Sequence, residues 1–128
     1  MDVTVSSVNA EQVRKLRLYL DSREPGDIGQ SELLEHISLL VNAVENGNTE
    51  TRSAAKDLVL KGIVSDNLLM RGICMGVVKD VNENRTSDTR KFVDDAYGAL
   101  RKAYYDSVSR TTRLEIYYKA MSTFLKKI

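Results

Sequence analysis

The stretch from Ser65 to Val81 reads SDNLLMRGICMGVVKDV, and its apolar side chains decide the fold. Wound as a helix at about 100° per residue, its leucine, methionine, isoleucine, cysteine and valine side chains point in nearly every direction. Such a helix is stable only where other helices cover it on all sides. The sequence therefore predicts a buried central helix at about residues 66–81, with Ser65 as its N-cap.

Three residues interrupt the apolar run from Leu68 to Val78 within this stretch. Arg71 is the one charged residue between Leu68 and Val78. We expect it at the rim of the core with its stem along the apolar surface, and the alternative is a buried pair with a carboxylate. Gly72 and Gly76 stand four residues apart, so we expect a neighbouring helix to approach the backbone closely there.

Further helical patterns precede and follow the central stretch. They predict helices at about residues 9–20, 28–45, 49–61, 88–108 and 112–128. Asn9 and Thr49 are expected as N-caps, and Gly47 suits the left-handed position that ends the second helix. Leu34 is expected on the inward face of that second helix, beside Leu33 and Ile37.

Length and composition are those of one folded domain, because 128 residues with 42% hydrophobic and 29% charged residues can bury a core. We therefore predict an all-α fold: a compact single-domain bundle of about six helices, over residues 1–128, around the central helix. Residues 1–8 precede the first helix and are expected to be flexible.

An apolar helix ringed by amphipathic helices is similar in pattern to the Bcl-2 family. The Asn-Trp-Gly-Arg sequence of that family is absent, and the chain contains no tryptophan. The resemblance therefore concerns the arrangement of helices and carries over no functional residue.

The net charge is only +1, so the overall electric field of the protein does not attract nucleic acid or an anionic membrane. Residues 1–64 hold seven basic and ten acidic residues, and residues 65–128 hold twelve and eight. The first twenty residues lack the layout of a signal peptide, and the longest apolar stretch is shorter than the ~20 residues of a membrane span. With one cysteine, an intrachain disulfide is excluded, and we expect a cytoplasmic, reducing location.

Residues with catalytic chemistry are scarce. His36 is the only histidine and Cys74 the only cysteine, so no familiar zinc pattern can form. Asp94 and Asp95 are adjacent, and side chains one residue apart on a helix diverge by about 100°. We therefore predict no catalytic, cofactor-binding or metal-ligating residue, no cofactor and no enzymatic activity.

The segment RKAYYDSVSRTTRLEIYYK, residues 101–119, combines four tyrosines with basic residues. Tyr104, Tyr117 and Tyr118 fall on or beside apolar helix faces and are expected to pack in the core or at its edge. Tyr105 points away from its apolar stripe, with Arg101 one turn before it. The pair fits a protein interface, where both residue types are enriched, and the alternative is inert surface, because a single exposed tyrosine is common.

The function that these patterns favour is a non-enzymatic protein–protein interaction or regulatory module, which binds a protein partner or a second copy of itself. Apolar residues on polar faces and the exposed tyrosine give the candidate interface residues Leu18, Arg101, Tyr105 and Ile116. The alternative is binding of RNA or DNA through the basic C-terminal half. The candidate contacts for it are Arg101, Lys102, Arg110, Arg113, Lys119, Lys126 and Lys127.

Overall fold

The computed structural model of the chain describes residues 8–106 and 119–124. The elements are α2 (Ala10–Asp21), the short 3-10 helix η1 (Pro25–Asp27), α3 (Gln30–Asn46), α4 (Thr49–Gly62), α5 (Leu68–Glu83), α6 (Ser87–Asp106) and the helical residues 119–124. No strand occurs within these described ranges, and the predicted all-α bundle is confirmed. The predictions for residues 1–7, and most of the helix predicted at 112–128, lie outside the described residues.

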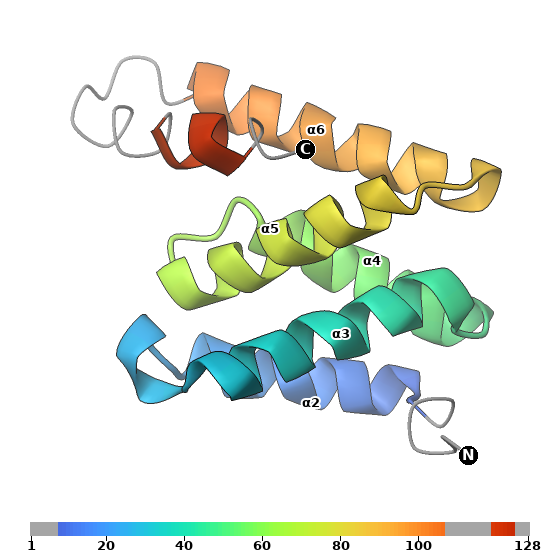
Figure 1. The fold of residues 1–128 in the computed structure, drawn as a ribbon, viewed down its shortest axis with the longest axis horizontal. Coiled ribbons are helices and arrows are strands. Elements are labelled where there is room, and N and C mark those ends of the chain that lie inside the picture. Colours follow the sequence, from blue (N-terminus) through green and yellow to red (C-terminus); the bar gives the residue numbers. More distant parts are fainter. Residues whose placement is uncertain (1–7, 107–118, 125–128) are drawn as a thin grey trace.

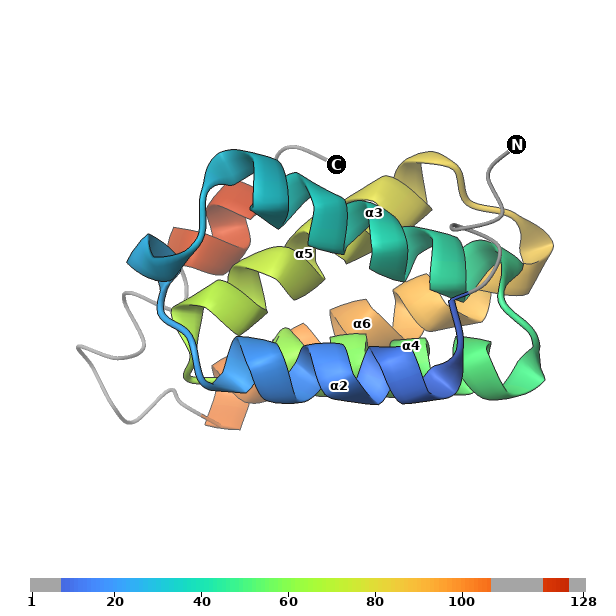
Figure 2. The ribbon, with the colours of Figure 1, turned by 90° about the horizontal axis from the view of Figure 1, so that it is seen from below.

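The helices form a bundle in which α2 and α6 lie at opposite ends, with α3, α4 and α5 between them (Figure 1). Figure 2 shows α2 in front of α4, with α3 and α5 on the other side of the bundle. Both α4 and α5 pack against α2, α3 and α6 as well as against each other. The predicted central helix α5 therefore shares the middle of the bundle with α4. No helix in the described part of the chain is both long and apolar enough to cross a membrane.

The side chains of α5 are enclosed along most of its length. Its buried hydrophobic residues are Leu69, Met70, Ile73, Cys74, Met75, Val77, Val78 and Val81. The open side is a narrow stripe at helical spacing that contains Leu68, which is 57% exposed, Gly72 and Glu83. The prediction of a shielded helix is thus confirmed for the body of α5 and is wrong for Leu68 at its N-terminal end.

Arg71 is only 7% exposed, so the predicted position at the rim is wrong. The physical reason is the direction in which Arg71 leaves the helix. Gly72 belongs to the open stripe, and Arg71 lies about 100° around the helix from it. That rotation turns its stem into the covered part of the circumference. The long arginine side chain therefore contributes buried contacts along its length.

The predicted close approach of a helix to the glycines of α5 is confirmed at one of the two positions. A Cβ at Gly76 would lie 2.7 Å from Cδ1 of Ile37, so α3 packs directly against the backbone there. A Cβ at Gly72 would have no atom within 4 Å, because Gly72 belongs to the open stripe.

Two predictions for α3 are also wrong. Leu34 is 54% exposed, because it lies about 120° around the helix from the buried Leu40. Gly47 has a φ of −68°, so it is not left-handed. Glycine is required there for space, since a Cβ would lie 2.5 Å from the carbonyl oxygen of Ala43.

Side-chain caps start α2, α4 and α5. Asn9 caps α2 as predicted, and Asn48, one residue before the predicted Thr49, caps α4. For α5 the cap is Asn67 and the prediction of Ser65 is wrong. The Asn67 Oδ1 accepts hydrogen bonds from the backbone N–H of Leu69, at 2.9 Å, and of Met70.

Asn67 also joins α5 to the end of α2. Its Nδ2 donates to the carbonyl oxygens of Leu20, at 3.2 Å, and Arg23, at 3.1 Å. The side chain therefore satisfies donors at the start of one helix and acceptors at the end of another, which explains why asparagine is used here.

Replacing Asn67 by alanine is expected to lower the free energy of unfolding by about 1–2 kcal/mol, because the cap and the bonds to α2 are lost together. The matched control is Asn9→Ala, since Asn9 caps α2 and, among the described residues, its side chain bonds the N-terminal turn of that helix alone. Urea unfolding followed by circular dichroism gives both values. Equal losses would contradict a role for Asn67 between the helices.

Candidate functional site

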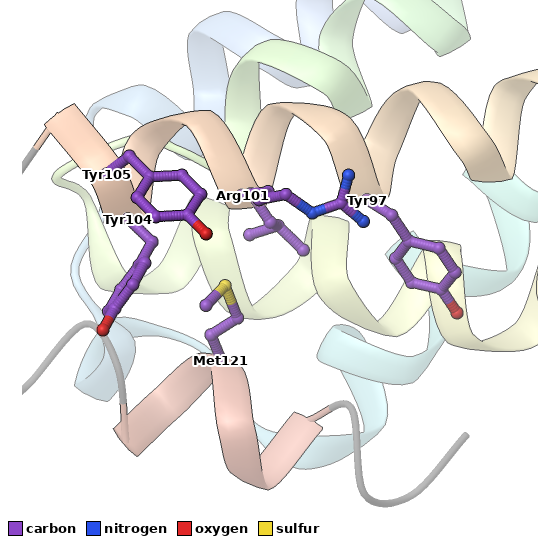
Figure 3. Close-up of a pocket in the computed structure, with 6 residues that line it drawn as sticks. Tyr97, Arg101, Tyr104, Tyr105 and Met121 are labelled. Carbon is purple, nitrogen blue, oxygen red and sulfur yellow. The ribbon is translucent and has the colours of Figure 1, made fainter.

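A hollow of about 310 Å³ lies between the C-terminal half of α6 and the helical residues 119–124. We call it the α6 hollow, and its lining residues are Tyr97, Leu100, Arg101, Tyr104, Tyr105 and Met121. All but Met121 belong to α6. Figure 3 shows Met121 approaching them from the facing helix. The hollow therefore joins two segments that are separated by residues 107–118 in the sequence.

The helical repeat explains why α6 presents this lining. Phe92, Val93, Ala96 and Leu100 form its buried stripe. The tyrosines and Arg101 follow at spacings of three and four residues along the edge of that stripe, so they share one side of the helix. The hollow is thus an extension of the core towards the surface.

The tyrosine rings provide most of the aromatic surface in the hollow. Tyr105 is 63% exposed, as predicted, and its ring meets the ring of Tyr104 edge to face at 5.5 Å between centroids. Tyr97 and Tyr104 are half-buried. Burial is the main cause that raises the pKa of the Tyr97 phenol above its ordinary value. The packing prediction for Tyr104 is confirmed, and its additional contact with a surface hollow was not predicted.

Arg101 supplies the positive charge at the hollow. Its side chain is exposed and, within residues 8–106 and 119–124, it forms no hydrogen bond or ion pair. Lys91 on the same helix, by contrast, pairs with Asp95 at 3.0 Å. The Arg101 guanidinium therefore remains available to a carboxylate brought by a ligand.

The structure brings together two of the four predicted interface residues, Arg101 and Tyr105. Leu18 is 70% exposed on α2, and α2 and α6 occupy opposite ends of the bundle (Figure 1). Leu18 is therefore a separate exposed residue and not a part of the α6 hollow. Ile116 lies outside the described residues.

The predicted nucleic-acid contacts are covered only in part. Arg101 and Lys102 are exposed on α6, and Lys119 is exposed at the start of the helical residues 119–124. The remaining four, Arg110, Arg113, Lys126 and Lys127, lie outside the described residues. Binding of RNA or DNA by this set stays a prediction.

A polar cluster around Glu32, separate from the α6 hollow, connects α2 and α3. One oxygen of this carboxylate accepts hydrogen bonds from the Tyr19 hydroxyl, at 2.7 Å, and from Nε2 of His36, at 3.0 Å. These bonds, first that of Tyr19 and then that of His36, lower the pKa of Glu32. Arg23 covers the Tyr19 ring, 4.6 Å from its centroid. The bond between Tyr19 on α2 and Glu32 on α3 cross-links the two helices.

The only cysteine lies apart from this cluster. Cys74 is fully buried, and its Sγ faces the carbonyl oxygen of Leu58 on α4. Burial raises the pKa of its thiol to about 12, so the nucleophilic thiolate is scarce at neutral pH. No hydrogen bond joins His36 to Cys74 in the described part of the chain, and those residues contain no group of three potential metal ligands.

No family model, curated protein or solved structure matches the chain.

Proposed function

We propose that the chain is a non-enzymatic protein–protein interaction module that docks a partner at the α6 hollow. The observation that supports this most directly is the composition of the lining, with three tyrosines, a leucine, a methionine and one arginine without a partner among the described residues. Tyrosine, methionine and arginine are enriched at protein interfaces, and tyrosine and arginine dominate binding energy there.

The lining defines what a partner must bring. An apolar or aromatic side chain of the partner fills the space between Leu100, Met121 and the tyrosine rings. Its binding is favourable because its apolar surface is removed from water. A carboxylate on the same segment meets the Arg101 guanidinium and forms charge-assisted hydrogen bonds. A partner helix provides both groups most simply when they stand three or four residues apart.

A protein partner is favoured over nucleic acid for two reasons. Tyr97 and Tyr104 are half-buried and only Tyr105 of the three is exposed, so the hollow offers no series of open rings on which successive bases could stack. Exposed Asp94 and Asp95 lie one to two turns from Arg101 on the same helix and weaken its attraction for phosphates. Retention of the chain on immobilised RNA or DNA tests the alternative. Binding to phosphates would give retention at low salt that falls steeply as the salt concentration rises.

Selection of short peptides from a displayed random library on the purified chain tests the docking site. We expect enriched peptides to carry an acidic residue one turn from an aromatic or leucine residue. Tyr105→Asp is expected to weaken binding of a synthetic enriched peptide by at least about tenfold, because it places a charge at the apolar lining. Fluorescence anisotropy measures both dissociation constants.

The matched control is Leu18→Asp, because Leu18 is an equally exposed apolar residue on the opposite end of the bundle. This variant should bind the peptide like the unmodified chain, and circular dichroism should show both variants folded. Absence of enrichment, or equal binding to Tyr105→Asp, would refute the α6 hollow as a docking site.

A further inference from the structure

The side of α6 that lines the hollow carries a longer row of residues. Arg90, Asp94, Tyr97, Arg101 and Tyr105 follow one another at spacings of four, three, four and four. At about 100° per residue they fall within a sector of about 80° around the helix. Four of them are exposed and Tyr97 is half-buried, so the row forms one accessible face of α6.

The charges in this row are available for an intermolecular contact. In the part of the chain that the structure describes, no ion pair or side-chain hydrogen bond engages Arg90, Asp94 or Arg101. Asp94 and Arg101 are seven residues apart, which is about 10 Å along the helix, too far for them to pair with each other. Both side chains are exposed, so each can pair with an opposite charge from another molecule.

The spacing of the row makes it complementary to itself. When a second α6 is laid antiparallel across the midpoint between Tyr97 and Gly98, Asp94 of each copy lies opposite Arg101 of the other. Arg90 then lies opposite Tyr105, which permits a cation–π contact. Tyr97 lies opposite Gly98, where a Cβ would have no atom within 4 Å and the helix surface is therefore open.

We infer that a second copy of this chain docks on this face of α6, beside the α6 hollow, by antiparallel pairing of the two α6 helices. This inference rests on the proposed function, because it places a protein partner on the side of α6 that lines the hollow. An unrelated acidic helix would satisfy Arg101 alone. A second copy satisfies Arg101 and Asp94 together through two equivalent contacts, as a two-fold interface requires.

Charge exchange at Asp94 and Arg101 tests the pairing in the full chain. Sedimentation velocity of the unmodified protein is expected to give twice the 14.4 kDa chain mass at high concentration. Asp94→Arg and Arg101→Asp should each weaken the dimer by at least about tenfold, because each sets like charges opposite one another twice. An equimolar mixture of the two variants should restore a dimer, since both contacts then join opposite charges.

Asp95→Arg is the matched control, because it makes the same exchange one residue along the helix and about 100° away from the row. It should sediment as a dimer. A monomeric unmodified chain at all concentrations, dimeric single variants or a monomeric mixture would each overturn the inference. A monomeric chain that still binds selected peptides at the hollow would leave the proposed function intact, which separates the two failures.

Discussion

Truncation of Leu69 to alanine is expected to lower the free energy of unfolding by about 2–5 kcal/mol. Leu69 is 4% exposed at the start of α5 and belongs to the continuous core. Removing its branched end both loses buried apolar surface and leaves a cavity that the surrounding helices fill only in part.

The adjacent leucine provides the control. Leu68→Ala makes the same chemical change on the same helix, but Leu68 is 57% exposed, so a loss within about 0.5 kcal/mol is expected. Urea unfolding of both variants, with unchanged slopes, gives the two values. Similar losses would mean that the open stripe of α5 is buried or that its N-terminal turn lies outside the core.

This contrast also marks how far the sequence predicts the fold. The central position of α5 follows from its own composition, because a helix that is apolar all round must be covered whatever the partners are. Which of two adjacent leucines faces out depends on where the neighbouring helices leave a gap. The same dependence explains Leu34 and Arg71, because the exposure of each side chain depends on which helices cover that side of its own helix.

The cap of α5 has a similar explanation. Ser65 and Asn67 are both suitable N-caps in sequence, and only Asp66 lies between them. The carbonyl oxygens of Leu20 and Arg23 select Asn67, since its amide can donate to them while its oxygen caps the helix. Those carbonyls are more than forty residues away in the chain. The sequence around residues 65–67 therefore does not show which of the two residues caps α5.

For the candidate site, the exposed pair was predictable and the hollow was not. The exposure of Tyr105 and its position one turn after Arg101 follow from the periodicity of α6 alone. The participation of Met121 depends on how the helical residues 119–124 lie against α6. That contact depends on tertiary packing. The sequence predicts only that Met121 is apolar and lies on an apolar helix face.

The contact between α4 and α5 gives the second large effect. A Cβ added at Gly62 would overlap Sγ of Cys74, which is fully buried. Gly62→Ala is therefore expected to lower the free energy of unfolding by about 1–3 kcal/mol, because the two helices must move apart. Gly72→Ala should instead raise it by about 0.5–1 kcal/mol, because that position is helical and open.

Removal of the sulfur should relieve the overlap. Cys74→Ala alone leaves a small void, whereas Gly62→Ala with Cys74→Ala places the new methyl group where the sulfur was. The double variant is therefore expected to be more stable than the sum of the single losses predicts, with a favourable coupling of about 0.5–3 kcal/mol. Recovery should be incomplete, because Cγ of Met70 remains 3.1 Å from the added Cβ.

A double-mutant cycle from thermal or urea unfolding of the four proteins measures this coupling directly. Additive losses would mean that the sulfur and the glycine do not share one space. α4 and α5 would then be farther apart than the structure places them. A measurable coupling, with Gly72→Ala showing none towards Cys74→Ala, would locate the closest approach of the two central helices at Gly62.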